Sequence, residues 1–264
     1  MPTVLSPKNP RISLARELLE AAGRRAQGRF LIEGFTMLDE ARRSGCPALE
    51  LYVNDALIGD ELDDADLAVY EAEGTAVYVV PGQAMARISD MTTPPGVTAV
   101  VPLPEHTARE ILAGPGPVLL LAGVNDPGNA GTLVRSAEAF GAAGVLFGRG
   151  GADPFGPKVV RATMGSIFRL PVAQIEAEAL LAAAQASGRP IIAADVDGED
   201  LRTAALPADA ILAVGNERRG VRDWLPRWDR AVRIPHSGST ESLNAAVAGS
   251  IVLYESARVA SSVK

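Results

Sequence analysis

The sequence predicts an α/β protein whose C-terminal part is a parallel β-sheet covered by helices on both faces. Two observations support this prediction. Short apolar runs of strand length alternate with helical patterns, beginning with the continuous apolar run at 118–124, which is typical of a strand buried on both faces. In the C-terminal stretch, apolar residues recur at helical spacing with small residues between them: Leu243, Val247, Ile251 and Tyr254. Strands that alternate with helices favour a parallel sheet.

The first hundred residues predict a smaller α/β unit of their own. Its expected elements are, in chain order, a helix at 9–26, a strand at 29–34, a helix at 35–43 and strands at 49–53, 76–80 and 97–101. The last of these strands follows the turn T-T-P-P-G. Four prolines between 102 and 117 indicate a linker. We therefore predict an N-terminal domain at 1–103, a linker at 104–117 and a C-terminal domain at 118–264.

The C-terminal domain alternates regularly between the two kinds of element. Strands are expected at 118–124, 145–147, 191–194, 211–214 and 231–234. Helices are expected at 132–140, from Lys158 onward, near 176–186 and in the final stretch after Ser242. The polar side chains of Ser242 and Asn244 suit the start of that last helix.

Composition excludes several classes of function. The 264 residues are 47% hydrophobic and carry a net charge of −7, so a basic footprint over the whole chain is absent. Residues 1–44 are nevertheless locally basic. The single cysteine, Cys46, cannot form a disulfide within the chain, and no Cys/His cluster has the spacing of a zinc site. We expect a cytoplasmic protein with no membrane span and no bound metal.

Three strand ends carry unusual polar loops. The loops are N-D-P-G-N-A-G at 125–131, G-N-E-R-R-G at 215–220 and the stretch from Pro235 to Asn244. Ligands of open α/β sheets bind beyond the carboxyl ends of the strands, so these loops mark the expected site. Neither a P-loop nor a G-x-G-x-x-G fingerprint is present. Ordinary turn chemistry explains the glycines equally well, and an exposed helix face would explain Arg135.

Taken together, the three loops resemble a known family. The segments N-D-P-G-N-A-G-T-L-V-R-S-A (125–137), I-L-A-V-G-N-E-R-R-G-V (211–221) and R-I-P-H-S-G-S-T-E-S-L-N-A-A-V-A (233–248) are similar to the three motifs of the SpoU/TrmH family. That family belongs to the SPOUT class and methylates the ribose 2′-hydroxyl of RNA with S-adenosylmethionine. The resemblance covers 118–256 closely. The N-terminal part looks, through F-L-I-E-G and T-T-P-P-G, like the L30e-like substrate-binding domain of many members.

The resemblance implies a fold, a cofactor and a set of site residues. It implies a C-terminal trefoil knot and a homodimer whose sites are completed across the interface. Contacts to S-adenosylmethionine are expected from Gly215, Asn216, Ile234 and Leu243. Arg135 matches the catalytic arginine, and the other polar motif positions, which would hold it and the ribose in place, are Asn129, Glu217, Ser242 and Asn244. The resemblance gives His236, in the cofactor loop, no catalytic part.

These matches predict an RNA 2′-O-methyltransferase. Ribosomal RNA is favoured over transfer RNA because L30e-like domains bind structured RNA. Alternatives left open are a transfer RNA enzyme, a catalytically silent RNA-binding module and an enzyme that acts on a small nucleotide. N-terminal basic residues are expected to contact RNA phosphates, although a solvated helix face would account for them as well: Lys8, Arg11, Arg24, Arg25 and Arg29.

Overall fold

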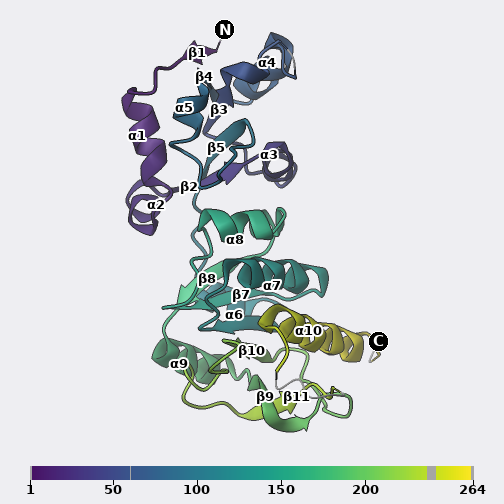
Figure 1. Ribbon diagram of the computed structural model, residues 1–264. Helices are drawn as coiled ribbons and strands as arrows, with labels where there is room; N and C mark the ends of the chain where they lie inside the picture. Colours follow the sequence, from purple (N-terminus) through teal and green to yellow (C-terminus); the bar gives the residue numbers. More distant parts are fainter. Residues whose placement is uncertain (1, 60, 237–241, 263–264) are drawn as a thin grey trace. The chain divides into compact units, whose positions relative to one another are not determined.

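The chain forms two compact units in the computed structural model, which describes residues 2–59, 61–236 and 242–262. The first unit comprises Met1–Pro104 together with Phe155–Phe168. The second comprises Glu105–Pro154 and Arg169–Lys264. The first unit is therefore discontinuous in sequence, because a short segment from the middle of the chain joins it (Figure 1).

The first unit is built on a mixed five-stranded sheet of order β1-β4-β3-β5-β2. Its strands are β1 (Thr3–Val4), β2 (Arg29–Glu33), β3 (Glu50–Asn54), β4 (Ala76–Val80) and β5 (Val97–Pro102). Strand β5 runs antiparallel to both of its neighbours. The helices are α1 (Pro10–Glu17), α2 (Ala21–Gln27), α3 (Phe35–Arg43), α4 (Asp64–Ala72), α5 (Gly82–Met85) and α8 (Pro157–Ala162), with 3₁₀ turns η1 (Asp55–Leu57) and η2 (Ser166–Phe168).

The second unit is built on a parallel six-stranded sheet of order β11-β9-β10-β6-β7-β8. Its strands are β6 (Val118–Ala122), β7 (Gly144–Gly148), β8 (Val172–Ile175), β9 (Ile191–Asp200), β10 (Ile211–Gly215) and β11 (Arg230–Arg233). Its helices are α6 (Ala108–Ala113), α7 (Pro127–Ala139), α9 (Ala177–Ser187) and α10 (Ala245–Ser262). The predicted α/β class and parallel C-terminal sheet are confirmed.

Helices cover both faces of the parallel sheet. Helices α7 and α10 lie against each other on one face, and α6 and α9 cover the other, as Figure 1 shows for α7, α10 and α9. The side chains between the sheet and α6 and α9 form one buried apolar cluster that includes Leu120, Leu146 and Leu180. Central strands read as continuous apolar runs because both of their faces are buried.

The prediction of one continuous helix at 9–26 is wrong, because two helices, α1 and α2, meet there at a corner. Gly23 lies so close to the end of α1 that a Cβ at this position would lie 2.0 Å from the backbone oxygen of Glu17. The buried guanidinium of Arg24 donates to the carbonyls of Leu18 (2.7 Å) and Leu19 (2.8 Å). Arg24 therefore binds carbonyls that the end of α1 leaves without helical partners.

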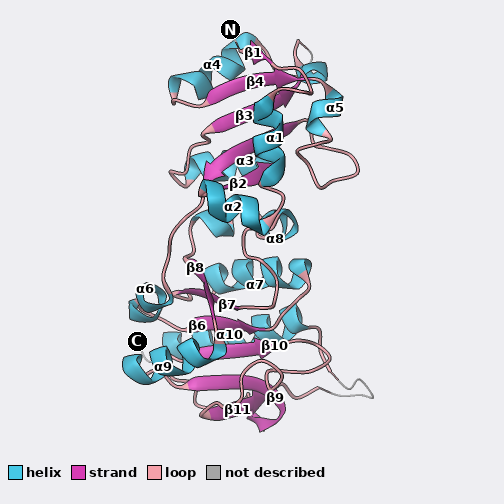
Figure 2. Cartoon of the chain, turned by 90° about the vertical axis from the view of Figure 1, so that its left-hand side faces the viewer, coloured by secondary structure: helices cyan, strands magenta, loops and turns pink. Residues whose placement is uncertain are grey.

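Strands β6, β9, β10 and β11 run in the same direction, so their carboxyl ends meet at one edge of the sheet (Figure 2). The last residues of β6 and β10, Ala122 and Gly215, are direct partners in the register. The predicted knot depends on the loop after β11, and 237–241 of that loop lie outside the described residues. Among the described residues, no helix combines the length and apolar character needed to cross a membrane.

Candidate functional site

The loop after β10 folds back tightly onto the end of its own strand. A Cβ at Gly215 would lie 2.1 Å from the carbonyl carbon of Gly220, which is closer than atoms can approach. The turn is closed by a hydrogen bond from the Gly220 amide to the Asn216 carbonyl (2.8 Å). Gly220 itself has φ +66°, a left-handed conformation that favours glycine. The glycines of this motif are therefore required by the backbone, as turn chemistry predicts.

Asn129, expected within a loop at 125–131, lies in the first turn of α7, because this helix begins at Pro127 rather than at 132. Asp126 caps this helix, and its Oδ1 accepts a hydrogen bond from the Asn129 amide (2.7 Å). Pro127 occupies the first helical position, where its missing N–H has no cost. The motif N-D-P-G-N thus encodes a helix start, and that start places the Asn129 side chain at the carboxyl edge of the sheet.

The third loop ends at Asn244, which caps α10. Its Oδ1 accepts from the backbone amides of Ala246 (2.9 Å) and Val247 (3.2 Å). The same side chain donates through Nδ2 to Oδ1 of Asn129 (3.0 Å). The Asn244 oxygen caps α10 while its nitrogen bonds to Asn129, so one side chain joins the start of α10 to the start of α7.

A further hydrogen bond joins the second loop to this pair. Asn129 Nδ2 donates to Oε1 of Glu217, which is half-buried. A carboxylate only accepts, and this fixes the orientation of the Asn129 amide. Three residues from three separate loops therefore form one hydrogen-bonded chain, from Asn244 through Asn129 to Glu217. The structure brings together side chains that lie up to 115 positions apart in the sequence.

Arg135 lies on α7, with its side chain exposed. It makes no hydrogen bond or ion pair with the residues that the structure describes. The helix that carries it is held firmly. A Cβ at Gly249 of α10 would lie 2.4 Å from a methyl carbon of Leu133, and Ser136 Oγ hydrogen-bonds Ser250 Oγ (2.7 Å). Arg135 thus combines a fixed backbone with a side chain that is available for a ligand.

The remaining predicted positions surround the same loops. Gly215 is buried, while Asn216, Ile234 and Leu243 are half-buried. Asn216 Oδ1 accepts from the Arg218 amide (3.0 Å), which shapes the second loop. Ser242 is exposed and has no hydrogen bond to a described residue. His236 Nδ1 donates to the Ile234 carbonyl (3.0 Å), so the histidine helps to hold the loop.

The N-terminal basic residues divide into three kinds. Lys8 and Arg25 are exposed, and Arg11 and Arg29 both reach Glu50 Oε1, at 3.3 Å and 3.4 Å. Arg11 also lies over the ring of Tyr78, 5.0 Å from its centroid. Arg24 departs from the expected phosphate contact, because only 4% of it is exposed and it binds backbone carbonyls. Sequence reasoning also missed Glu50, an acid within a strand that gathers these arginines.

A second polar cluster lies in the first unit. Arg161 of α8 pairs with Glu33 (3.2 Å) and, through both terminal nitrogens, with Asp90, while Ser89 Oγ donates to Glu33 Oε2 (2.5 Å). Burial raises the pKa of Glu33, and this outweighs the opposite effects of the Ser89 hydrogen bond and the charge of Arg161. Among the described residues, no group of three or more His, Cys, Asp or Glu side chains could hold a metal ion.

Comparison with known families gives two matches on this chain. Residues 116–254 match the SpoU rRNA Methylase family, and residues 9–99 match the MRM3-like substrate binding domain. The first match contains all three polar loops. The second covers most of the unit that contains Glu33 and Glu50.

Individual relatives match over nearly their whole length. The chain is 32% identical to the 23S rRNA (guanosine(2553)-2′-O)-methyltransferase RlmP of Bacillus subtilis, over 96% of this chain and 98% of that protein. It is 30% identical to a 23S rRNA (uridine(2479)-2′-O)-methyltransferase of Streptomyces viridochromogenes, over 96% and 91%. The crystal structure of the SpoU methyltransferase AviRb from Streptomyces viridochromogenes, in complex with AdoMet, is similar with a TM-score of 0.84 at 28% identity, over 97% of this chain and 99% of that one.

Proposed function

The chain belongs to the SpoU rRNA methylase family, and from this premise we propose that it transfers a methyl group from S-adenosylmethionine to a ribose 2′-hydroxyl of 23S ribosomal RNA. Two full-length relatives carry that RNA in their names, one with a guanosine and one with a uridine as target. The names therefore support 23S ribosomal RNA as the substrate class. We accordingly propose that the enzyme acts in the cytoplasm, where a ribosomal substrate would be found.

The cofactor fits the residues at the carboxyl edge of the parallel sheet. A similar structure binds AdoMet. Gly215 and Asn216 would contact it through the tight second loop, and the half-buried Ile234 and Leu243 offer apolar surface for its adenine. When bound, S-adenosylmethionine supplies an activated methyl group on a sulfonium. The protein has to position the ribose hydroxyl and assist loss of its proton.

Arg135 is the residue that we assign to the hydroxyl. A guanidinium stays protonated in proteins, so Arg135 acts by charge and orientation rather than as a simple base. A fixed cation beside the 2′-oxygen stabilises the negative charge that develops there as the proton leaves. One observation carries this assignment: the polar chain from Asn244 through Asn129 to Glu217 is satisfied internally, whereas Arg135 has no described partner.

Asn129, Glu217 and Asn244 serve as positioning residues in this proposal. Their hydrogen bonds lock the three loops in one arrangement, and such preorganisation contributes to rate by holding reactants in line. Ser242, exposed at the mouth of the third loop, is available to the ribose. In this proposal the three loops bind the cofactor and the ribose, and Arg135 stabilises the negative charge that develops on the 2′-oxygen.

Mapping of ribose methylation by mass spectrometry tests the proposal. We expect a strain lacking the gene to lose one methylated ribose in 23S rRNA, and we expect the purified protein to restore that methyl group with S-adenosylmethionine. An unchanged 23S map with a lost transfer RNA site would move the substrate to transfer RNA. Unchanged maps, with no transfer by the purified protein, would favour a silent RNA-binding module.

A homodimer is also proposed, with α10 at its interface. Val247 and Tyr254 on this helix are 48% and 54% exposed, which is high for apolar side chains. The ring of Phe140 packs edge-on against Tyr254 at 5.7 Å and extends the apolar surface towards the end of α7. Sedimentation analysis should show a dimer in the wild type. Tyr254→Lys should shift it towards monomer, because a charge would be buried at the interface.

The N-terminal domain, proposed at 1–103, is expected to hold the RNA. Lys8 and Arg25 are exposed, and Arg11 and Arg29 share the single carboxylate of Glu50, so these four side chains together keep a net positive charge, whereas Arg24 is committed to the corner between α1 and α2. Phosphate contacts release counterions, so RNA affinity should fall with salt, and Arg25→Ala should reduce that slope by about one. Arg24→Ala should instead lower the melting temperature. If Arg25→Ala leaves the salt dependence of RNA affinity unchanged, Arg25 does not contact RNA phosphates.

A further inference from the structure

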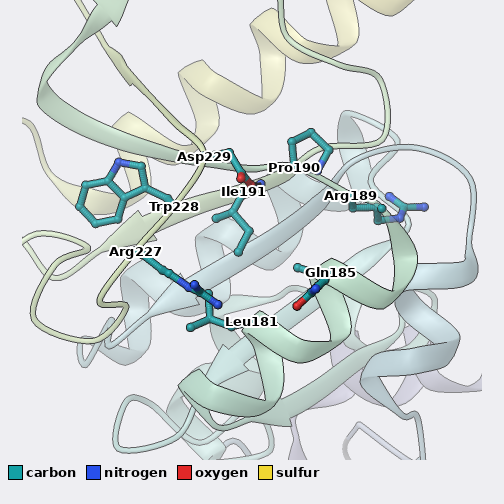
Figure 3. A pocket seen from close by; sticks show the side chains of 10 residues that line it. Leu181, Gln185, Arg189, Pro190, Ile191, Arg227, Trp228 and Asp229 are labelled. Atoms are coloured by element: carbon teal, nitrogen blue, oxygen red, sulfur yellow. Dashed lines mark hydrogen bonds between the residues drawn. The ribbon is translucent and has the colours of Figure 1, made fainter.

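A pocket of about 490 Å³ lies at the end of the parallel sheet opposite the three polar loops. It is lined by α9, by the segment leading into β9 and by the segment that leads into β11. In Figure 3, Arg227 and Trp228 lie on one side of the pocket, and Gln185 and Arg189 lie on the other, with Ile191 and Asp229 between them. This volume is within the range of small-molecule sites.

Two charged residues of the pocket build its frame. Arg189 is 8% exposed and donates to the carbonyls of Gly116 (2.8 Å), Asp209 (2.8 Å) and Gly114. Asp229 accepts from the Ile191 amide through Oδ2 (2.7 Å). These bonds fix the backbone at the starts of the strands, so the pocket has rigid walls.

Other polar groups of the pocket have no such structural task. Arg227 and Gln185 are exposed, and neither side chain bonds to a described residue. The same holds for the indole N–H of Trp228, whereas the N–H of Trp224 donates to the Arg149 carbonyl (2.9 Å). Arg222 lies over the Trp228 ring, 5.1 Å from its centroid, which fixes the indole. The cationic side chain of Arg227, the amide of Gln185 and the indole N–H of Trp228 thus line one cavity, and none of these three polar groups hydrogen-bonds to a described residue.

We propose that this pocket binds one nucleotide of single-stranded RNA, with the base against Trp228 and the phosphate at Arg227. Unstacked bases are recognised by packing on aromatic side chains and by hydrogen bonds to their edges. Gln185 and the second carboxylate oxygen of Asp229 can supply those hydrogen bonds, and Arg227 supplies a cation in a chain of net charge −7. The inference rests on the proposed function for the source of the nucleotide.

Edge strand β11 connects the pocket to the proposed reaction site. The strand begins at Arg230, directly after the pocket residue Asp229, and leads into the third loop at Ile234. At about 3.3 Å per residue, its four residues span about 13 Å. Arg233 on this strand is exposed and only loosely paired with Asp200 (3.9 Å). An RNA strand held in the pocket can therefore follow β11 towards the ribose that is methylated.

Binding of a short single-stranded RNA oligonucleotide to the full-length protein tests the proposal by fluorescence anisotropy over a salt series. Arg227→Ala should weaken binding about tenfold and reduce the salt slope by about one. Trp228→Ala should weaken binding about tenfold as well, while Trp228→Phe should keep most of the affinity because a ring remains. Arg109→Ala is the matched control, an exposed arginine of the same unit that does not line the pocket. It should change neither quantity.

Four further measurements separate the outcomes: melting temperature, S-adenosylmethionine affinity, binding of guanosine monophosphate and methylation by the wild type. Melting temperature and S-adenosylmethionine affinity report folding; if Trp228→Ala unfolds, the exposed Arg227→Ala decides alone. Direct binding of guanosine monophosphate, measured by calorimetry, distinguishes the sources of the nucleotide: mononucleotide binding that depends on Arg227, with RNA binding unaffected by either variant, overturns the RNA assignment in favour of a free nucleotide. Wild-type RNA affinity in Arg227→Ala, with normal methylation by the wild type, refutes the pocket and leaves the proposed function intact. If RNA binding depends on Arg227 but the wild type methylates no RNA, the proposed function is refuted and the pocket remains an RNA site.

Discussion

Arg135 and Arg161 both lie on helices, and their side chains differ in whether they have ion-pair partners. Arg161 is 27% exposed in its side chain and its guanidinium is neutralised by Glu33 and Asp90. Arg135 is exposed and has no partner among the described residues, although Asn129 in the first turn of the same helix bonds to Glu217 and Asn244. In the first unit, the guanidinium of Arg161 pairs with the carboxylates. In the second unit, the amide of Asn129 donates to the carboxylate of Glu217 instead.

The difference indicates which cluster is structural and which is prepared for a ligand. An ion pair that is closed on itself leaves no charge to offer, and it holds α8 in the first unit. The amide chain from Asn244 to Glu217 keeps three loops in place while leaving a full positive charge on Arg135. If this comparison is correct, changes at Arg135 act on rate, and changes at Arg161 act on stability.

The largest effect is expected for Arg135→Ala. We predict that turnover falls about 10³-fold or more, because a fixed positive charge at the developing oxyanion is lost. Affinity for S-adenosylmethionine should stay within about twofold, since cofactor contacts come from the second and third loops and the lost interaction acts on the transition state. Arg135→Lys should be nearly as damaging, because a point charge does not replace a planar fork of donors. Single-turnover kinetics and calorimetry on the same preparation measure both properties.

Arg109→Ala serves as the control for this prediction, because it removes an exposed arginine of the same unit. It should leave turnover and cofactor affinity unchanged. If a folded Arg135→Ala protein keeps wild-type turnover, Arg135 takes no part in methyl transfer. Loss of cofactor binding at an unchanged melting temperature would instead show that cofactor and catalytic contacts are not separate.

Arg161→Ala tests the other side of the comparison. The side chain of Glu33 is 1% exposed, and removal of Arg161 leaves its charge without the ion pair. Breaking such a partly buried pair should cost about 2–4 kcal/mol in the free energy of unfolding. Chemical denaturation measures this loss, and S-adenosylmethionine affinity of the folded variant should not change. Arg43→Ala, which breaks an exposed pair with Asp39, is the matched control and should cost under about 1 kcal/mol.

Sequence reasoning succeeded where local pattern and tertiary structure agree. Apolar runs located the central strands because burial on both faces leaves a clear mark, and the predicted strand at 29–34 is observed as β2. The three motifs led to a single edge of the sheet because parallel strands share their carboxyl ends. The hydrogen bonds between Asn129, Glu217 and Asn244 could be anticipated only as proximity, since side-chain pairing across 115 positions has no local signal.

Failures came from contacts that local pattern does not contain. One helix was expected at 9–26, because neither the close approach of Gly23 to Glu17 nor the carbonyl contacts of Arg24 can be read from spacing. The same contacts explain why Arg24 resembled a surface cation in the sequence and is buried in the structure. The segment Phe155–Phe168 belongs to the first unit although its neighbours in sequence belong to the second. Its ion pairs with Glu33 and Asp90 are non-local as well.

Asn129→Ala should have an intermediate effect, because it removes the middle of the chain that joins the three loops. Glu217 loses its donor and Asn244 loses its acceptor, while the caps of α7 and α10 use other atoms and persist. We expect turnover to fall about 10- to 100-fold, with a smaller change in cofactor affinity, because positioning rather than charge is lost. Ser136→Ala, which removes a hydrogen bond between the same two helices, is the control. Equal losses in both variants would reduce Asn129 to a packing role.

The smallest effect is expected for Glu33→Gln, and it appears as a change in pH dependence. Burial raises the pKa of Glu33 in the folded protein above its unfolded value, which is about 4.3. Between these two values the folded state binds more protons than the unfolded state, so stability falls as pH rises through this window. Glu33→Gln removes that loss. The variant should therefore gain stability relative to the wild type from pH 4 to pH 7, by under about 1 kcal/mol because Arg161 also loses one partner. Denaturation midpoints at a series of pH values measure the difference, with the exposed Glu71→Gln as control. A variant that instead loses several kcal/mol at neutral pH would show that the ionised Glu33 stabilises the first unit. The ion pairs of Glu33 and the amide hydrogen bond of Glu217 would then differ only in degree.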